Sequence, residues 1–397
     1  MHRLASLVVL LVAGAAGAED KVHSIEPPLT KPKKMGDKRI VEPFDKVRLH
    51  VWIPDGVKVV RGAVVNPFNE KQVEQKHWQE ACRAWGFALV GADYFGVNAA
   101  DYAPTLKAGL KALAADLTRP ELEHLPFAFV GMSAGAGMSV KFAEQMPERI
   151  VALGLVCLEV GPTNDDLRKI PTLTVFGEKD GKQMEQLLAK LPEQRKLGAR
   201  WAIAIQWGRG HEFGAANNLV MPWFDVCIRL RLPPGADLTK APAKLTDVAE
   251  QDGWVAEPAM KNTPQAKSVV AAKSVKPADA ASQCWFPTEG LGRAWHGFVT
   301  YGNGAIASPA ALGDKRPFAV IEAGKPVPLK LTGVKDLTTF DVFVSGKKVA
   351  SLARAEAGDT AEFTIEKLPA GVHTLVVRPT NVPDALGPLK PAVVVVR

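Results

Sequence analysis

Cysteine is scarce in this sequence, since only four of its 397 residues are cysteines: Cys82, Cys157, Cys227 and Cys284. None of the four lies at a metal-binding spacing from a histidine, so the sequence predicts no metal site. Four cysteines permit three disulfide pairings if all are bonded, and nothing in the sequence selects one of them. Cys82 and Cys157 lie in apolar helix and strand patterns, which favours buried free thiols at these two positions.

Long apolar runs are lacking after residue 20, whereas a helix that spans a bilayer needs about 20 apolar residues. At the N-terminus, Arg3 precedes the short apolar run Leu4–Ala18, and Glu19 follows it. A basic residue, a short apolar run and small residues before an acidic one are typical of a signal peptide, here residues 1–18. We therefore expect a secreted or periplasmic protein that does not insert stably into a membrane.

The sequence also lacks the clustered basic residues of nucleic-acid-binding proteins. Its formal net charge is +7 and its isoelectric point is about 9.1, but Lys and Arg are spread along the chain. It has no arginine-rich helix, no zinc-finger spacing and no alternation of aromatic and basic residues. We therefore expect no nucleic-acid partner, and we interpret the charge as a solvated surface with a weak preference for anionic matrices.

Length and pattern indicate a large domain followed by a smaller one, because 397 residues exceed the size at which one hydrophobic core stops growing. From residue 47 to about 232, β-branched runs alternate with helical patterns, which predicts an α/β fold with a mostly parallel, doubly wound sheet. The predicted strands are Val47–Ile53, Gly62–Val65, Phe87–Ala92, Phe127–Val130, Val151–Val156, Thr172–Phe176 and Trp201–Ile205. The predicted helices are Val73–Trp85, Ala103–Asp116, Ala136–Met146, Lys182–Leu191 and Ala215–Leu230.

A Pro-, Ala- and Lys-rich segment at 233–283 follows, and its composition is typical of a flexible linker. Trp254 and Trp285 would be costly to leave in water, so we expect this segment to wrap around the large domain and dock on it. Residues 289–301 carry apolar side chains at helical spacing, which predicts a last helix of that domain. The large domain is therefore placed at 19–303.

Residues 304–397 show a different pattern, because short strands follow one another without helices. This pattern predicts a small antiparallel β-sandwich of immunoglobulin-like or fibronectin-like size. It contains no catalytic grouping, so we expect it to be dispensable for chemistry on a small substrate and either to bind a polymer or to stabilise the large domain. The predicted strands are Phe318–Glu322, Val327–Leu331, Phe340–Val344, Lys348–Leu352, Ala361–Ile365, Val372–Val377 and Ala392–Val396.

The motif GMSAG at residues 131–135 places Ser133 between two glycines, after a predicted strand and before a predicted helix. Small neighbours permit a strained turn that exposes the hydroxyl, and the start of a helix favours developing negative charge. This context predicts that Ser133 is a catalytic nucleophile in a strand-turn-helix elbow.

A serine hydroxyl needs a base to take its proton, and the base needs a carboxylate to fix its tautomer. His211 fits best as the base, because it follows the last predicted strand in a glycine-rich loop and the other histidines lie in worse positions. In the chain order Ser, acid, His, the acid lies between the two. Asp180 is the preferred acid, and Glu159 and Glu178 remain alternatives.

The anionic oxygen of a tetrahedral intermediate needs backbone N–H donors. Ala134, directly after the nucleophile, is the first expected donor. The second is expected from the loop after the strand Gly62–Val65, where Phe68 is preferred to Asn69 because Pro67 has no N–H.

Residues that follow strands at the carboxyl edge are also expected to line the substrate pocket, so Tyr94, Phe95, Phe68 and Trp207 are candidates for an aromatic-lined acyl or ring site. About 15 residues separate two of the late predicted strands, too few for a large lid, which indicates an open site.

The elbow at Ser133, the loop that carries Asp180 and the loop that carries His211 together resemble the α/β-hydrolase superfamily over roughly residues 40–232. The elbow GMSAGAGM is similar to that of secreted feruloyl esterase and polyhydroxybutyrate depolymerase relatives, which reads GLSAGG. The sequences GWVA at 253–256 and CWFP at 284–287 are similar to the tails of secreted bacterial hydrolases of this superfamily. The resemblance implies a serine esterase that needs no cofactor and acts on carbohydrate-linked acetyl or feruloyl esters, including esters bound to a polysaccharide.

Two other functions remain open at this point. The same triad also cleaves amides, so a serine peptidase is one alternative. A non-catalytic protein that binds a polysaccharide or a cell-surface partner through its β-sandwich is the other. An intact set of Ser133, Asp180 and His211 favours an enzyme over the binding protein.

Overall fold

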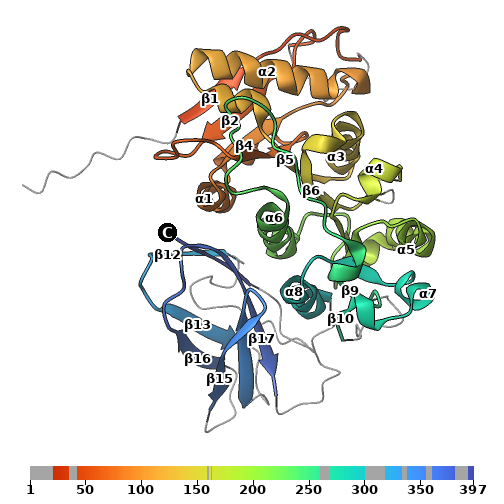
Figure 1. The fold of residues 1–397 in the computed structure, drawn as a ribbon, viewed down its shortest axis with the longest axis vertical. Helices are drawn as coiled ribbons and strands as arrows, with labels where there is room; N and C mark the ends of the chain where they lie inside the picture. The colour runs from red at the N-terminus through yellow and green to blue at the C-terminus, as the bar shows by residue number, and fades with distance from the viewer. Residues whose placement is uncertain are drawn as a thin grey trace, which may run out of the picture.

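The computed structural model describes residues 21–34, 43–158, 161, 163–259, 268–299, 318–332, 338–354, 360–380 and 392–397 (Figure 1). The predicted signal peptide at 1–18 and the alternative acid Glu159 lie outside these residues. Within the described ranges, every helix is too short or too polar to cross a membrane.

An eight-stranded sheet forms the centre of the large domain, with the strand order β1-β2-β4-β3-β5-β6-β7-β8. The strands from β4 to β8 are parallel, and β1 and β2 add an antiparallel edge. The mostly parallel sheet predicted from the sequence is therefore confirmed. The strands are Lys21–Ile25 (β1), Leu49–Ile53 (β2), Gly62–Asn66 (β3), Phe87–Ala92 (β4), Phe127–Met132 (β5), Ile150–Val156 (β6), Thr172–Gly177 (β7) and Trp201–Gln206 (β8).

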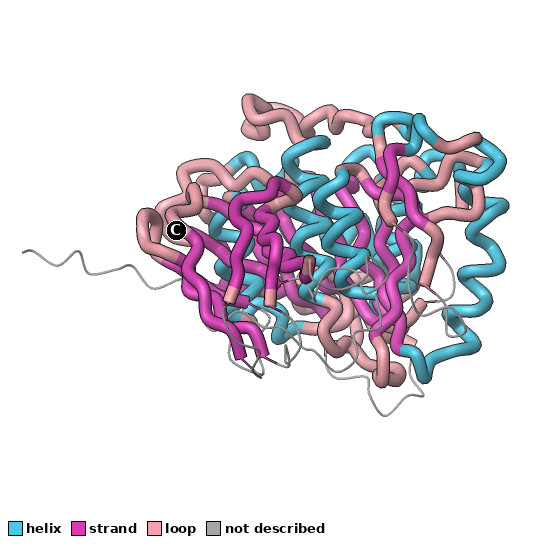
Figure 2. The backbone as a smooth tube through the Cα atoms, turned by 90° about the horizontal axis from the view of Figure 1, so that it is seen from below, coloured by secondary structure: helices cyan, strands magenta, loops and turns pink. Residues whose placement is uncertain are grey.

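Helices cover both faces of this sheet, with α1, α6 and α8 on one side and α2 and α3 on the other (Figures 1 and 2). The strands can bury both faces because successive side chains alternate: Ala63 and Val65 lie in one core cluster and Val64 in the other. The predicted helix Val73–Trp85 is a 3-10 turn followed by α1. The helices are Lys76–Trp85 (α1), Tyr102–Asp116 (α2), Ala134–Gln145 (α3), Asp165–Arg168 (α4), Gly181–Lys196 (α5), Asn217–Arg231 (α6), Pro277–Ala280 (α7) and Glu289–Val299 (α8).

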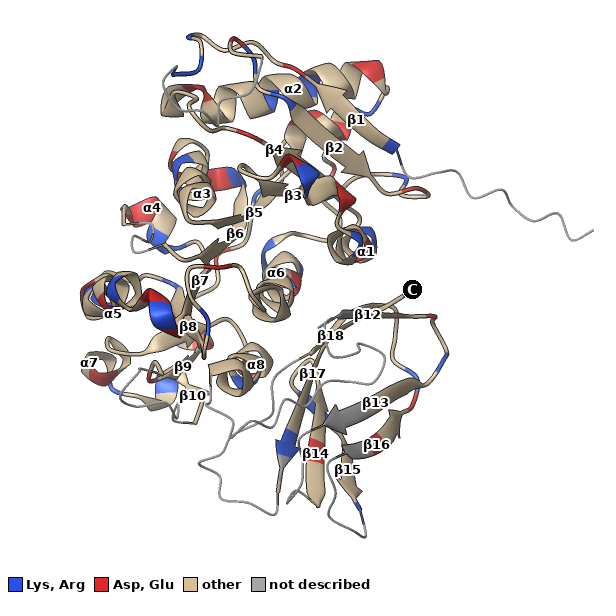
Figure 3. Cartoon of the chain, turned by 180° about the vertical axis from the view of Figure 1, so that it is seen from behind, with Lys and Arg blue, Asp and Glu red and all other residues tan. Residues whose placement is uncertain are grey.

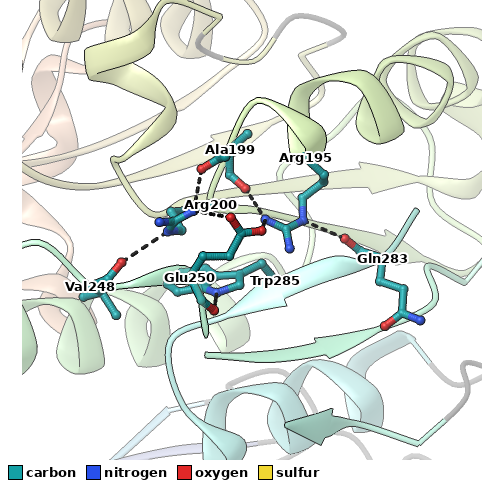
Figure 4. Close-up of polar contacts among 8 residues, drawn as sticks. Arg195, Ala199, Arg200, Val248, Glu250, Gln283 and Trp285 are labelled. Atoms are coloured by element: carbon teal, nitrogen blue, oxygen red, sulfur yellow. Dashed lines mark hydrogen bonds and ion pairs between the residues drawn. The ribbon is translucent and has the colours of Figure 1, made fainter. Parts of the chain in front are cut away.

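The segment 233–283 docks on the large domain in its described parts, as its tryptophans led us to expect. Three short strands, Trp254–Ala256 (β9), Val270–Ala271 (β10) and Cys284–Phe286 (β11), form an antiparallel sheet in the order β10-β9-β11. Glu250 pairs with the fully buried guanidinium of Arg195 at 2.8 Å and with Arg200 at 3.2 Å (Figure 4). The Glu250 carbonyl also accepts a hydrogen bond from Trp285 Nε1 at 3.1 Å, so Glu250 links this segment both to the two arginines and to β11.

The C-terminal strands form a five-stranded sheet, in the order β12-β18-β17-β14-β15, and a two-stranded sheet of β13 and β16. All seven strands lie where the sequence predicted them, but the predicted antiparallel arrangement is wrong for one pair, because β12 runs parallel to β18. The immunoglobulin-like assignment stays a prediction. The five-stranded sheet lies beside α1, α6 and α8 (Figure 1). The strands are Phe318–Ile321 (β12), Val327–Thr332 (β13), Thr339–Val344 (β14), Lys347–Ala353 (β15), Thr360–Ile365 (β16), Gly371–Pro379 (β17) and Ala392–Val396 (β18).

The strands β17 and β18 of this sheet are buried on both faces. On β18, Val394 belongs to the interior of the C-terminal domain, while Val393 and Val395 belong to the core cluster that contains α1, α6 and α8. On β17, Val372 and Val376 face that same cluster. The C-terminal domain therefore shares a hydrophobic core with the large domain.

Basic and acidic residues are interspersed over the described elements of the large domain (Figure 3). Examples are the pairs Lys141–Glu144 on α3 and Arg229–Asp225 on α6. The excess of basic residues in the sequence is thus distributed among neighbouring acids, as expected for a solvated surface.

Candidate active site

Ser133 occupies a strained turn between β5 and α3. Its backbone angles are φ 52° and ψ −119°, which are costly for a residue with a side chain and cluster at functional sites. The turn is tight: a Cβ atom on Gly131 would lie 2.4 Å from the carbonyl of Gly135. Only glycine at residue 131 allows the strand and the helix to approach in this way, as the nucleophile elbow requires.

Asp180 and His211 are brought together from the ends of two neighbouring strands. Asp180 closes the 3-10 turn after β7, and His211 lies in the loop after β8. His211 Nδ1 is 3.1 Å from each carboxylate oxygen of Asp180. The Asp180 side chain is 11% exposed and that of His211 is 40% exposed, so the carboxylate lies beneath a ring that reaches solvent.

Close backbone contacts hold these two loops against each other. A Cβ atom on Gly177 would lie only 2.1 Å from the carbonyl oxygen of Gly210, so the histidine loop passes directly over the end of β7. Lys179 N–H donates to the carbonyl of Arg209 at 2.8 Å. Glu178, one of the alternative acids, instead accepts a hydrogen bond from Gly208 N–H at 2.9 Å.

Gln206 supports the other end of the histidine loop, a role that no sequence pattern indicated. Its buried side chain accepts from Ala215 N–H at 2.7 Å and donates to the carbonyl of Phe213 at 3.3 Å. Both ends of the loop that carries His211 are therefore fixed to β8.

Cys157 is a further member of the cluster that sequence reasoning missed. It follows β6 with a left-handed φ of 54°, and its Sγ lies with Asp180 and His211 in a group whose ligand atoms are all within 4.8 Å of one another. Burial first, and then the neighbouring Asp180 carboxylate, raise the pKa of the Cys157 thiol to about 12. The thiol is therefore neutral near pH 7. All four cysteines are buried and free.

Ser133, Asp180 and His211 all follow strands that end at one edge of the sheet. Because β5, β6, β7 and β8 are parallel neighbours, their carboxyl ends lie at the same edge, and the three residues follow the ends of β5, β7 and β8. Among the described contacts there is no hydrogen bond from Ser133 Oγ to His211. Bonds of this kind are often long in enzymes without substrate and shorten when substrate binds.

The two expected oxyanion donors differ in their surroundings. Ala134 is the first residue of α3, where a backbone N–H has no acceptor within the helix. Phe68 lies beside the elbow, because a Cβ atom on Gly135 would meet Phe68 Cβ at 2.8 Å. However, the N–H of Phe68 already donates to Asn66 Oδ1 at 3.2 Å, so Phe68 would have to give up this bond to act as the second donor.

Tyr94 is a core residue, which corrects its assignment to the pocket wall. It is fully buried, its ring lies edge-on to Phe142 with the centroids 4.9 Å apart, and its hydroxyl bonds to Thr105. The turn after β4 explains the difference: Asp93 accepts a hydrogen bond from Phe95 N–H at 2.8 Å. The chain thereby directs Tyr94 inward.

The other two aromatic candidates are half-buried near the loops of the site. The Phe95 ring lies 5.7 Å from the ring of Phe68, which itself touches the elbow. Trp207 begins the histidine loop, and its Nε1 donates to the carbonyl of Val299 at 2.7 Å, which links this loop to α8.

Two cavities in the described part of the chain lie away from these residues. One of about 500 Å³ lies between α6, α8 and the turn at Ser345 and Gly346, and another of about 570 Å³ lies near Lys244. Ser133, Asp180 and His211 line neither of them.

No protein-family model matches the chain, and none of the curated proteins matches it. A CIB-like hydrolase from Thermoplasma acidophilum is similar in structure, with 15% identity and a TM-score of 0.35 over 53% of this chain and 100% of its own. A dienelactone hydrolase from Anabaena variabilis is similar with 16% identity and a TM-score of 0.36 over 52% of this chain and 98% of its own. A cold-adapted esterase from an Arctic intertidal metagenomic library is similar with 15% identity and a TM-score of 0.37 over 54% of this chain and 98% of its own.

Proposed function

We propose that this chain is a serine hydrolase of the α/β-hydrolase type that cleaves carboxylic esters through an acyl-enzyme at Ser133. The strained elbow carries the proposal: a non-glycine residue at φ 52° between a buried parallel strand and a helix persists only where its surroundings enforce it. The contact between Asp180 and His211 at the same edge of the sheet adds the base and its orienting acid.

In the proposed mechanism, Ser133 Oγ attacks the ester carbonyl while His211 Nε2 takes its proton. Asp180 holds the other nitrogen, Nδ1, in its protonated form and stabilises the imidazolium that develops. The N–H of Ala134 donates to the oxyanion. His211 then protonates the departing alcohol, and a water molecule activated by the same nitrogen releases the acid from Ser133.

We further propose that the substrates are carbohydrate-linked acetyl or feruloyl esters outside the cytoplasm. The aromatic pair of Phe68 and Phe95 supports this choice, since it lies beside the elbow, where the acyl group of a bound ester would be. A peptidase is the second candidate, because the same three groups cleave amides.

The test uses p-nitrophenyl acetate turnover and covalent labelling by a fluorophosphonate. Ser133→Ala should abolish both, with a loss in kcat on the order of several powers of ten. The control is Ser282→Ala, an exposed serine whose hydroxyl only bonds to the carbonyl of Asp279, and it should retain both. Ser133→Ala activity within about tenfold of the parent would rule out the nucleophile. Faster cleavage of an anilide than of the matching ester would favour the peptidase.

A further inference from the structure

Cys157, Asp180 and His211 bring three different ligand types to one point. A thiol sulfur, a carboxylate oxygen and an imidazole nitrogen lie within 4.8 Å of one another, at the ends of β6, β7 and β8. Among the described residues, this is the one group of three or more His, Cys, Asp or Glu side chains that are this close. Sulfur, nitrogen and oxygen together are the donor set that zinc uses in proteins.

The geometry is close to that of a tetrahedral site. Two ligands that each lie about 2.0 Å from a tetrahedral zinc ion are about 3.3 Å apart. The distance between His211 Nδ1 and Asp180 Oδ1 is 3.1 Å, so this edge of the tetrahedron is already formed. Cys157 Sγ contacts the carbonyl of Glu212 at 3.7 Å and lies within 4.8 Å of the other two ligand atoms, so it would form the third corner by moving closer to them.

The group reaches solvent on one side and leaves one ligand position open. Cys157 is buried, Asp180 is half-buried and His211 is exposed, so the solvent-facing side of the group is the His211 ring. Three protein ligands leave the fourth position of a tetrahedral ion for water, as in catalytic zinc sites.

We propose that Cys157, Asp180 and His211 bind a zinc-class divalent cation, and that the bound cation switches off the hydrolase. On binding, the thiol proton leaves to solvent, because a coordinated thiol is deprotonated. The metal takes the lone pair of Nδ1, and the single proton of the neutral imidazole then resides on Nε2. A protonated Nε2 cannot accept the proton of Ser133. The inhibition, although not the binding, rests on the function proposed above.

The binding test uses Co²⁺ as a spectroscopic substitute for Zn²⁺ on the Ser133→Ala protein, so that catalysis plays no part in the readout. One equivalent of Co²⁺ should bind with a sulfur-to-metal charge-transfer band in the near ultraviolet, and Zn²⁺ should displace it. Cys157→Ala should remove the band and weaken Co²⁺ binding about tenfold to hundredfold. The matched control, Cys82→Ala, removes a buried thiol of α1 and should retain both.

The outcomes separate the two proposals. Binding of Co²⁺ without a sulfur band, or equal affinity in Cys157→Ala with thermal unfolding showing both variants folded, would overturn the metal site. The inhibition test measures, for each variant, the turnover with Zn²⁺ divided by the turnover without it. This ratio should be closer to one in Cys157→Ala than in Cys82→Ala. A sulfur band in the Ser133→Ala protein, together with a parent protein that no fluorophosphonate labels, would support the metal site and contradict the esterase.

Discussion

His211 Nδ1 lies 3.1 Å from both carboxylate oxygens of Asp180, although the two residues are 31 positions apart in the sequence. This contact fixes which ring nitrogen carries the proton, because a carboxylate can only accept. The opposite nitrogen, Nε2, is then free of a proton and able to act as a base.

Asp180→Asn should therefore lower kcat on esters by on the order of ten-thousand-fold, because an amide can donate to Nδ1 and stabilise the wrong tautomer. The control is Glu178→Gln, since Glu178 accepts from Gly208 N–H and an amide oxygen can still do so. It should cost less than about tenfold. If Glu159→Gln proves more damaging than Asp180→Asn, the acid follows β6 and not β7.

A glycine pair tests whether the close contact between the two loops matters for the site. Gly177→Ala should lower kcat/KM by about a hundredfold or more, because its Cβ would lie 2.1 Å from the Gly210 carbonyl and displace His211. Gly210→Ala should be tolerated, since a Cβ there meets nothing within 4 Å. Equal activity in the two variants would show that the histidine loop adapts without loss.

Much of this arrangement was predictable because its signals are local. About a dozen positions contain the strand before Ser133, the small residues around it and the helix after it. The alternation of strands and helices along the chain predicts the parallel sheet. The chain order of acid and base then limited the choice to a few loops.

The remainder depends on contacts that no local pattern reveals. Cys157 and Gln206 were missed because their partners come from other loops of the fold. Tyr94 was misassigned because the direction of its side chain depends on the turn made by Asp93 and Phe95. The strand β1 was not among the predicted strands, because its sequence carries no alternation that would predict pairing with β2.

Glu250 should be important for stability, because it neutralises a guanidinium that is buried. Removing its charge in Glu250→Gln should lower the free energy of unfolding by about 1–3 kcal/mol, since Arg195 would stay buried without its partner. The control is Glu144→Gln, which breaks the exposed pair with Lys141 and should cost less than about 0.5 kcal/mol. Urea unfolding of the two variants measures the difference, and equal losses would show that the Glu250 contacts contribute only as a surface pair.

Asp225 makes the stability depend on pH. Burial raises the pKa of its carboxyl to about 6, although Arg229 and Trp85 favour the charged form. The folded protein therefore holds this proton more tightly than the unfolded chain, and the cost of the charge is absent below about pH 4 and complete above about pH 6. Asp225→Asn should raise the free energy of unfolding by on the order of 2–3 kcal/mol at about pH 8 and change it little at about pH 4.

The control for this substitution is Asp116→Asn, at the exposed end of α2, which should give the same small difference at both pH values. Urea unfolding at the two pH values provides the measurement. A loss of stability in Asp225→Asn at about pH 8 would mean that the ion pair with Arg229 outweighs the cost of burial.

The shared core predicts that the C-terminal domain stabilises the catalytic part. A chain that ends near Asn303 would lack β17 and β18 and would expose the apolar surface of α1, α6 and α8 that their buried valines cover. Burying an apolar side chain fully contributes about 1.5 kcal/mol or more, so the truncated chain should lose more than about 5 kcal/mol and unfold at a much lower temperature. Turnover of p-nitrophenyl acetate and of an acetylated or feruloylated polysaccharide should then fall together.

A pair of point variants tests the same idea in the full-length chain. Val395→Ala weakens the face toward the helices, and Val394→Ala weakens the interior of the C-terminal domain. Each should cost about 2 kcal/mol. If the two domains unfold as one unit, calorimetry should show a single transition that both variants lower alike. Two results together would show that the domain holds a polymer and does not stabilise the enzyme. The first is that Val394→Ala lowers a separate transition. The second is that the truncated chain keeps its melting temperature and its small-ester turnover but loses activity on the polysaccharide.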